Sequence, residues 1–267
     1  MSRTRTLPSL CLILFSVTAA CKTTAPPPAA SPGAPAPAPA TRAAAAMPES
    51  IRWVTNSAEY VAATLQAYRV VTSRVELEGA KRPAGSWAVV LDADETIISN
   101  VRYQAERASQ GLGFTAESWN VWVKRREATP IAGAAAFLAR VHQLGGRIAV
   151  VTNRLGSECD DTIAVFRAHA LVFDAMLCRP DGTPSDKNPR FEAVARGITP
   201  AGSTPLEILA FVGDNILDFP QLSQNARAQA DQALRDFGVR FILIPNPMYG
   251  SWQKDKGHRV IERSGDR

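Results

Sequence analysis

The chain has 267 residues, of which 46% are hydrophobic and 21% charged, so the part that follows its low-complexity start is long enough for one domain with a sizeable core. The formal net charge of +5, which falls when the arginines of the first segment are removed, is too small to indicate binding to a nucleic acid polymer. No internal repeat is visible.

Residues 1–20 are typical of a secretory signal peptide. Two arginines precede the apolar stretch 7–17, which is too short to span a bilayer as a mature helix. Cys21 follows two alanines, as at the cleavage and lipidation site of a lipoprotein, although Thr18 stands where such sites usually carry Leu. We expect a lipid anchor at Cys21; cleavage near Ala20, which would release a soluble periplasmic protein, is the alternative.

Residues 21–47 are predicted to form an extended tether. The stretch from Thr24 to Met47 is almost entirely Ala, Pro, Ser and Thr, a composition that cannot build a core. Such a tether fits an anchored Cys21, and it also fits a spacer at the start of a soluble protein. The remaining residues, 48–267, are predicted to form the folded domain.

That domain is predicted to begin with a long amphipathic helix. Apolar residues recur at helical spacing from Ile51 to Val75, with Glu49 and Ser50 at the start and Gly79 at the end. One apolar face of this helix is expected to pack on a sheet.

Short apolar runs then alternate with helical stretches, one of which is predicted over Ile131–Leu144. This alternation predicts an α/β fold with a parallel sheet and helices on both faces. The interval between the first two runs is too long for one crossover, so about residues 100–127 are expected to be an inserted helical cap. The apolar runs are Ala88–Leu91, Ile148–Val151, Leu171–Leu177, Leu209–Val212 and Phe241–Ile244.

Four aspartates follow two of these runs. Asp92 and Asp94 come directly after Leu91, and Asp214 and Asp218 follow the run that ends at Val212. Ligands bind at the carboxyl edge of an open parallel sheet, where these side chains would converge. Paired acids repel unless a cation neutralises them or one is protonated, so the pattern fits a Mg²⁺ site in which one aspartate attacks and another transfers a proton. Any single aspartate could instead be a helix cap or a turn residue.

The motifs around these aspartates resemble the haloacid-dehalogenase superfamily, in the group of phosphatases with two aspartates in the first motif and two in the last. The first motif stands here as Asp92-Ala93-Asp94-Glu95-Thr96, and the last as Gly213-Asp214-Asn215-Ile216-Leu217-Asp218-Phe219. The resemblance is closer to bacterial class C acid phosphatases, which are surface or outer-membrane lipoproteins, and it extends from about Arg52 to Trp252. It implies a HAD-type, Rossmann-like parallel sheet with a small helical cap. The supporting segments are Ser57–Tyr60, Ser118–Val123, Val151–Arg154, Lys187–Phe191 and Pro245–Trp252.

The resemblance also implies catalytic roles. Asp92 would be the nucleophile, because an ionised carboxylate can attack phosphorus to give an aspartyl-phosphate. Asp94 would protonate the leaving alkoxide and then deprotonate water, and its backbone carbonyl would bind the metal. Asp214 would be the third protein ligand of Mg²⁺, while Asp218 either completes the metal site through water or orients Lys187. Lys187 matches the residue that supplies a cation to the phosphate and the nucleophile; a lone lysine in a polar loop would more often be merely solvated.

Further residues match the substrate-binding positions of the family. Thr152 corresponds to the hydroxyl that binds a phosphate oxygen, and Asn153 follows it on the same turn. Trp119 in the cap and Tyr249 in a late loop would stack on the two faces of a nucleotide base. Trp119 and Trp122 are three residues apart and share a helix face. For Trp119 a place in the core of the cap fits as well as a stacking role, whereas for Trp122 the core is favoured.

The remaining cysteines and histidines indicate no further catalytic centre. Cys159 and Cys178 either form one disulfide or remain two buried thiols, and their spacing fits no metal site. His142, His169 and His258 lie in helical or terminal polar contexts and are expected at the surface.

We therefore predict Mg²⁺-dependent hydrolysis of phosphomonoesters, in particular nucleoside 5′-monophosphates, through an aspartyl-phosphate at the cell envelope. The expected partners are a small phosphate ester and, through the lipid anchor, the outer membrane; a homo-oligomer is left open. Two alternatives are phosphoryl transfer to an alcohol in place of water, and a non-catalytic surface lipoprotein that binds a ligand on the same fold.

Overall fold

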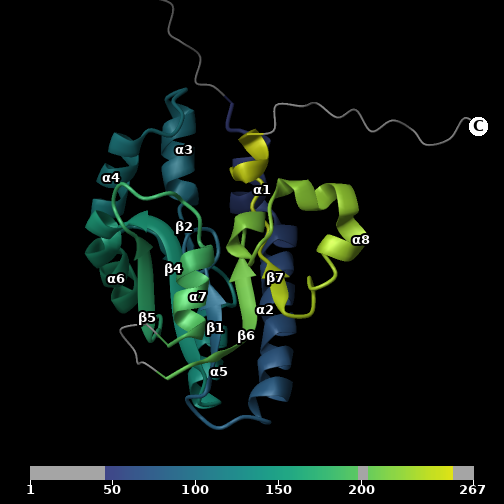
Figure 1. The fold of residues 1–267 in the computed structure, drawn as a ribbon. Helices are drawn as coiled ribbons and strands as arrows, with labels where there is room; N and C mark the ends of the chain where they lie inside the picture. Colours follow the sequence, from purple (N-terminus) through teal and green to yellow (C-terminus); the bar gives the residue numbers. More distant parts are fainter. Residues whose placement is uncertain (1–45, 198–203, 255–267) are drawn as a thin grey trace, which may run out of the picture. The chain divides into compact units, whose positions relative to one another are not determined.

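The computed structural model describes residues 46–197 and 204–254 (Figure 1). The predicted signal peptide, Cys21, most of the predicted tether and His258 lie outside the described residues. Within the described ranges, none of the helices has the length and apolar character needed to cross a membrane.

A five-stranded parallel sheet forms the centre of the described part, in the order β5-β4-β1-β6-β7 (Figure 1). Each strand overlaps one of the five predicted apolar runs, and the predicted α/β class is confirmed. The middle strand is buried at every residue, as expected for a parallel strand covered on both faces. The strands are β1 (Trp87–Leu91), β4 (Arg147–Leu155), β5 (Ala175–Arg179), β6 (Glu207–Gly213) and β7 (Phe241–Leu243).

Alternate residues of the central strands pack into two separate hydrophobic layers. In β1, Val89 and Leu91 belong to one core cluster and Val90 to the other, because successive side chains of a strand point to opposite faces. The first cluster packs against α2 (Ala58–Gly79), α5 (Ala134–Gln143) and α6 (Cys159–Ala168). The second packs against α7 (Asn188–Ala195), which Figure 1 shows in front of the sheet while α2 lies behind it.

The N-terminal helix is interrupted, so the single helix predicted from Ile51 to Val75 is wrong at one point. α1 (Glu49–Asn56) and α2 are separated at Ser57, whose backbone is extended. The Ser57 hydroxyl accepts a hydrogen bond of 3.1 Å from the Tyr60 amide and so caps α2. The apolar residues keep their helical spacing across Ser57, so the spacing alone does not reveal this break between the two helices.

Two other predicted boundaries shift. The strand predicted from Leu171 forms only from Ala175, whereas β4 continues past the predicted end at Val151 to Leu155. Because β4 is longer, three polar residues, Thr152, Asn153 and Arg154, are held by strand geometry at the edge of the sheet.

A helical insertion lies between β1 and β4. It begins and ends with two short antiparallel strands, β2 (Ile98–Ser99) and β3 (Thr129–Pro130), and contains α3 (Val101–Ser109) and α4 (Ala116–Arg125). Tyr103 and Ser118 join the two helices through a hydroxyl–hydroxyl hydrogen bond of 2.8 Å. Figure 1 shows both helices beyond the carboxyl ends of the strands, and we refer to residues 101–125 as the cap.

The remaining elements are short. They are α8 (Ala230–Ala233) and four 3₁₀ turns: η1 (Gly156–Glu158), η2 (Ile216–Asp218), η3 (Gln224–Gln229) and η4 (Ser251–Lys254).

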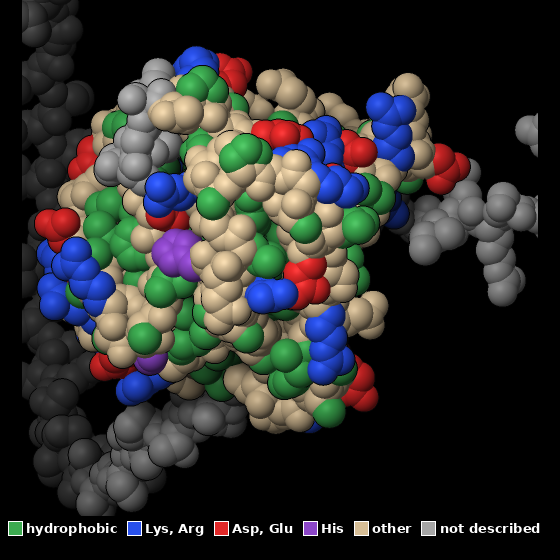
Figure 2. All heavy atoms as spheres, turned by 90° about the horizontal axis from the view of Figure 1, so that it is seen from below, with side chains coloured by type: hydrophobic (Ala, Val, Ile, Leu, Met, Phe, Trp, Pro, Cys, Tyr) green, Lys and Arg blue, Asp and Glu red, His purple; other side chains and the backbone are tan. Residues whose placement is uncertain are grey.

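The opposite, amino-terminal edge of the sheet is an ordinary solvated surface. Figure 2 shows that acidic and basic side chains are interspersed there with small hydrophobic areas. Asp174 at this edge accepts hydrogen bonds from His142 at 2.8 Å and from Arg147 at 2.9 Å. His142 is therefore part of a hydrogen-bonded network at the surface, at the edge of the sheet opposite the four aspartates.

Candidate active site at the carboxyl edge of the sheet

Neighbouring parallel strands bring three of the four predicted aspartates together. Leu91 of β1 pairs with Val212 of β6, and the Asp92 amide donates to the Val212 carbonyl at 3.0 Å. Both chains therefore leave the sheet at the same level. One carboxylate oxygen from each of Asp92, Asp214 and Asp218 lies within 4.8 Å of the others.

The turn after β6 folds Asp218 back against its own strand. Asn215 caps η2, and its amide donates to Asp218 Oδ2 at 2.8 Å. A Cβ atom at Gly213 would lie 2.6 Å from that same oxygen, so only glycine leaves room for the carboxylate beside the strand. The Gly-Asp-Asn sequence thus places two carboxylates in one small space.

Lys187 lies buried between two of these carboxylates, so it is not a solvated loop residue. Its ammonium group donates to Asp92 Oδ1 and, at 2.7 Å, to Asp218 Oδ1. The Lys187 side chain is 3% exposed. Asp218 thus contacts Lys187, as in one of the two roles considered for it, and its position beside Asp92 and Asp214 also fits the other, at the metal site.

The carboxylates outnumber the cation that faces them. Burial raises the pKa of Asp92 to about 7, the charge of Lys187 opposes this rise, and Asp218 adds to it. Burial and the charges of Asp218 and Asp92 raise the pKa of Asp214 well above its usual range. Burial alone would lower the pKa of Lys187, but its two ion pairs raise it above the ordinary value. A cluster of oxygen ligands with excess negative charge fits a divalent cation such as Mg²⁺.

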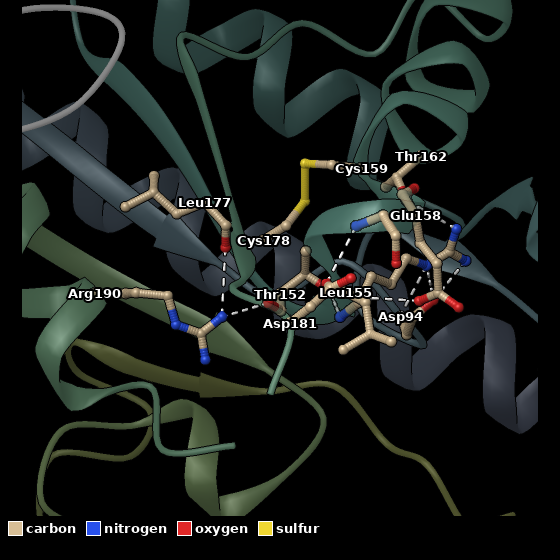
Figure 3. Close-up of a disulfide and its surroundings, with 12 residues drawn as sticks. Asp94, Thr152, Leu155, Glu158, Cys159, Thr162, Leu177, Cys178, Asp181 and Arg190 are labelled. Carbon is tan, nitrogen blue, oxygen red and sulfur yellow. Dashed lines mark hydrogen bonds and ion pairs between the residues drawn. A yellow bond between two sulfur atoms is a disulfide. The ribbon is translucent and has the colours of Figure 1, made fainter. Parts of the chain in front are cut away.

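Asp94, which Figure 3 labels, is held by a buried arginine, Arg154. Arg154 Nη2 and Nε lie 2.8 and 3.0 Å from Asp94 Oδ1, and Nε lies 3.2 Å from Oδ2. The Arg154 side chain is 1% exposed and that of Asp94 is 18% exposed, so the arginine is buried while the carboxylate is partly accessible. The Asp94 side chain is therefore not one of the three carboxylates that lie within 4.8 Å of one another.

Thr152 and Asn153 lie within the last part of β4, and not on the turn predicted for them. Arg190 of α7 holds this segment, since its guanidinium donates to the Thr152 carbonyl (Figure 3) and, at 2.6 Å, to Asn153 Oδ1. The sequence motif around Lys187 includes Arg190 but does not indicate this role. The buried lysine directly precedes α7, and the helix itself supplies the arginine that supports the predicted phosphate-binding segment.

The two predicted stacking residues make different contacts. The Arg154 guanidinium lies over the Trp119 ring at 5.3 Å, and Tyr103 packs edge-on against that ring at the same distance. The Tyr249 hydroxyl donates to Glu95 Oε1 at 3.0 Å. In the described ranges no aromatic contact joins Trp119 and Tyr249 directly.

Glu95 fixes the loop that follows the first motif. Its φ of 55° is left-handed, a conformation that is unfavourable for a residue with a side chain. Its carboxylate accepts hydrogen bonds from the Asn100 amide at 2.8 Å and from the Ser99 hydroxyl at 3.2 Å, and these hold the turn. Burial raises the pKa of Glu95 to about 7, although the bonds from Asn100 act in the opposite direction.

The two cysteines form a disulfide, the first of the alternatives left open by the sequence. Cys159 at the start of α6 and Cys178 in β5 are joined with a Cα–Cα distance of 6.0 Å (Figure 3). The bond ties the segment after β4 to the neighbouring strand. In that segment the Leu155 amide donates to the buried Glu158 carboxylate at 3.0 Å.

Comparisons with known proteins agree with this geometry. The chain matches the family model of the HAD superfamily, subfamily IIIB (Acid phosphatase), over residues 35–252. The structure is similar to the class C acid phosphatase from Bacillus anthracis, with a TM-score of 0.68 and 28% identity over 79% of this chain and 89% of that chain. It is also similar to the class C acid phosphatase from the same organism with tungstate bound, with a TM-score of 0.67 and 26% identity over 80% of this chain and 90% of that chain.

Proposed function

Because the chain belongs to the acid phosphatases of HAD subfamily IIIB, which are phosphomonoester hydrolases, we propose that it hydrolyses its substrate through an aspartyl-phosphate on Asp92. The observation that carries this proposal is the convergence of Asp92, Asp214 and Asp218 within 4.8 Å. Lys187 between two of these carboxylates supports it, since phosphoryl transfer depends on positioning and charge neutralisation.

In the first half of the reaction, the Asp92 carboxylate attacks phosphorus. The bond between its oxygen and phosphorus forms while the bond to the ester oxygen breaks. Asp94 gives its proton to the departing oxygen, which leaves as an alcohol. Lys187 keeps the nucleophile in place through Oδ1, and Thr152 at the end of β4 binds a phosphate oxygen with Asn153 beside it.

In the second half, Asp94 takes a proton from water as the water oxygen bonds to phosphorus. The bond between phosphorus and Asp92 breaks, inorganic phosphate leaves, and Asp94 is protonated again for the next cycle. Both halves use the same two aspartates, and no other acid or base is required.

Mg²⁺ is the cation we propose for the carboxylate cluster. The side chains of Asp92, Asp214 and Asp218 would hold it, together with the backbone carbonyl of Asp94. When bound, it would neutralise charge on the transferring phosphoryl group. The excess of buried carboxylates over Lys187 supports a divalent cation over a second protein cation.

Nucleoside 5′-monophosphates are the proposed substrates. Trp119 in the cap and Tyr249 in the late loop supply aromatic surfaces near Asp94 and Glu95, through the contacts described above. Base stacking on such residues is tolerant of base identity. The structure of the relative with tungstate, a tetrahedral oxyanion like phosphate, supports oxyanion binding in this family.

Export and lipid anchoring at Cys21 remain part of the proposal. The disulfide between Cys159 and Cys178 supports an oxidising compartment, since such bonds are rare in cytosolic proteins.

The test is phosphate release from a nucleoside monophosphate by the full-length protein, with Mg²⁺ and with a chelator. We expect release that requires the metal and is lost in Asp92→Asn. Asp231→Asn, the same change at an exposed residue, should retain activity. An added alcohol acceptor distinguishes hydrolysis from phosphoryl transfer, and release that persists in Asp92→Asn would contradict the mechanism.

A further inference from the structure

Asn100 occupies a helix-capping position without capping the helix. It directly precedes α3, where an asparagine side chain normally accepts a hydrogen bond from an amide of the first turn, but its side chain makes no such bond. The residue is fully buried. Its amide group is instead directed into a polar network at the base of the cap.

Four side chains meet this amide. Nδ2 donates to Asp94 Oδ1 at 2.8 Å and to Glu95 Oε1 at 3.1 Å. Oδ1 accepts from Trp122 Nε1 at 2.8 Å and from Arg154 Nη2 at 3.0 Å. All the contacts pair a donor with an acceptor.

The amide cannot be reversed. Indole and guanidinium nitrogens are donors only, so the Asn100 oxygen must face Trp122 and Arg154, and its NH₂ group must face the carboxylates. Trp122 Nε1 carries a single hydrogen, which is used in this bond. The indole of α4, together with Arg154, therefore determines which end of Asn100 faces Asp94.

The network treats the two oxygens of Asp94 differently. Oδ1 accepts from Arg154 Nη2, Arg154 Nε and Asn100 Nδ2, at 2.8, 3.0 and 2.8 Å. Oδ2 has one contact with the protein in the described part, from Arg154 Nε at 3.2 Å. Oδ1 is thus anchored by short bonds, while Oδ2 is left for another partner.

We propose that Asn100 and Trp122 are positioning residues for Asp94, which hold Oδ1 so that Oδ2 exchanges the proton with the ester oxygen. This inference rests on the proposed function, in which the proton moves from Asp94 to the departing oxygen as the P–O bond breaks. It adds that a residue of cap helix α4 acts on the acid through the Asn100 amide.

The proposal predicts an effect that depends on the leaving group. An ester of a strongly acidic phenol, such as 4-nitrophenyl phosphate, can lose its phenolate without a proton, whereas an alkyl phosphate needs the acid. A misplaced Asp94 should therefore slow alkyl esters more than 4-nitrophenyl phosphate. A general loss of folding or of phosphate binding would slow both alike.

Trp122→Phe tests this in the full-length protein because it removes the indole N–H and keeps an aromatic ring. Trp87→Phe is a matched control: both tryptophans are at most 1% exposed, and Trp87 Nε1 has no hydrogen-bond partner within the described residues. For Trp122→Phe we expect kcat/KM to fall about tenfold with an alkyl phosphate, the size of one lost hydrogen bond, and less than about threefold with 4-nitrophenyl phosphate. Trp87→Phe should show the same ratio between the two esters as the wild type.

Asn100→Ala provides a second variant, with thermal unfolding and circular dichroism as measures of folding. In Asn100→Ala the loss of kcat/KM with the alkyl phosphate should exceed the loss with 4-nitrophenyl phosphate by a larger factor than in Trp122→Phe. This loss should lie mainly in kcat for the alkyl phosphate. Equal losses for both esters in Trp122→Phe and Asn100→Ala, or a Trp122→Phe enzyme that behaves like Trp87→Phe, would overturn the positioning role. A wild-type protein that hydrolyses neither ester would instead overturn the proposed function and this inference with it.

Discussion

Replacing Lys187 by Met should destabilise the fold strongly when divalent cations are removed. The lysine is 4% exposed, and its partners Asp92 and Asp218 are 8% and 5% exposed. Removing one partner of a buried ion pair typically costs about 3–5 kcal/mol, because the remaining charge stays buried without compensation. We expect Lys187→Met to lower the free energy of unfolding by about that amount in the presence of a chelator.

Urea unfolding followed by circular dichroism measures this loss. The double variant Lys187→Met/Asp218→Asn should recover part of it, because one of the two unpaired carboxylates becomes neutral. Lys81→Met is the matched control, since the Lys81 side chain is 57% exposed and its ion pair with Glu78 lies at the surface. This control should leave the free energy of unfolding almost unchanged.

Similar losses of unfolding free energy in Lys187→Met and Lys81→Met would show that the buried ion pairs of Lys187 contribute no more than a surface pair. A greater loss in Lys187→Met/Asp218→Asn than in Lys187→Met would show that the unpaired buried carboxylates are not the source of the instability.

Three further predictions concern the disulfide, the stacking residue and the surface ion pairs. Replacing both Cys159 and Cys178 by Ala should lower the free energy of unfolding by about 3 kcal/mol, since the bond joins residues 19 positions apart; equal urea midpoints would contradict this. Trp119→Ala should raise KM for a nucleoside monophosphate more than KM for 4-nitrophenyl phosphate. Equal increases in the two KM values would exclude stacking of Trp119 on the nucleotide base. Burial alone would raise the pKa of Asp174, but hydrogen bonds from His142 and a backbone amide hold it below its usual value. The ionised Asp174 carboxylate therefore stabilises the fold fully above the unfolded pKa of about 3.9, and this stabilisation is lost as the pH falls through the lower pKa of the folded protein. In this acidic range the melting temperature of Asp174→Asn should change less with pH than that of the wild type.

The sheet could be predicted from sequence because parallel strands buried on both faces need short apolar runs. Such a run leads directly to Asp92, and another leads to Asp214. The break at Ser57 could not be predicted from hydrophobic spacing, because a single side-chain hydrogen bond to Tyr60 produces it. The end of β4 was missed for a related reason, since polar residues from Thr152 onward carry no apolar signal.

The site could be predicted only in part. Motif spacing indicated the aspartates and Lys187, but it could not show that Arg154 is buried against Asp94, because that contact depends on the extension of β4. Nothing in the sequence singles out Asn100, and the spacing of Trp122 favours the core of the cap. Trp122 is indeed buried, and the hydrogen bond of its indole becomes visible only when the cap and β4 are placed together.

The most direct test of the central claim is the mass of the peptide that contains Asp92 after acid quenching during turnover. We would use Asp94→Asn with 4-nitrophenyl phosphate, because this ester can form the intermediate without an acid while hydrolysis of the intermediate lacks its base. The account predicts that this peptide gains one phosphoryl group, and that the gain is absent when Asp92 is also changed to Asn. The mechanism would be contradicted if the wild type turned over the ester while neither the wild type nor Asp94→Asn carried a phosphoryl group on Asp92. An adduct on a residue other than Asp92 would contradict it as well.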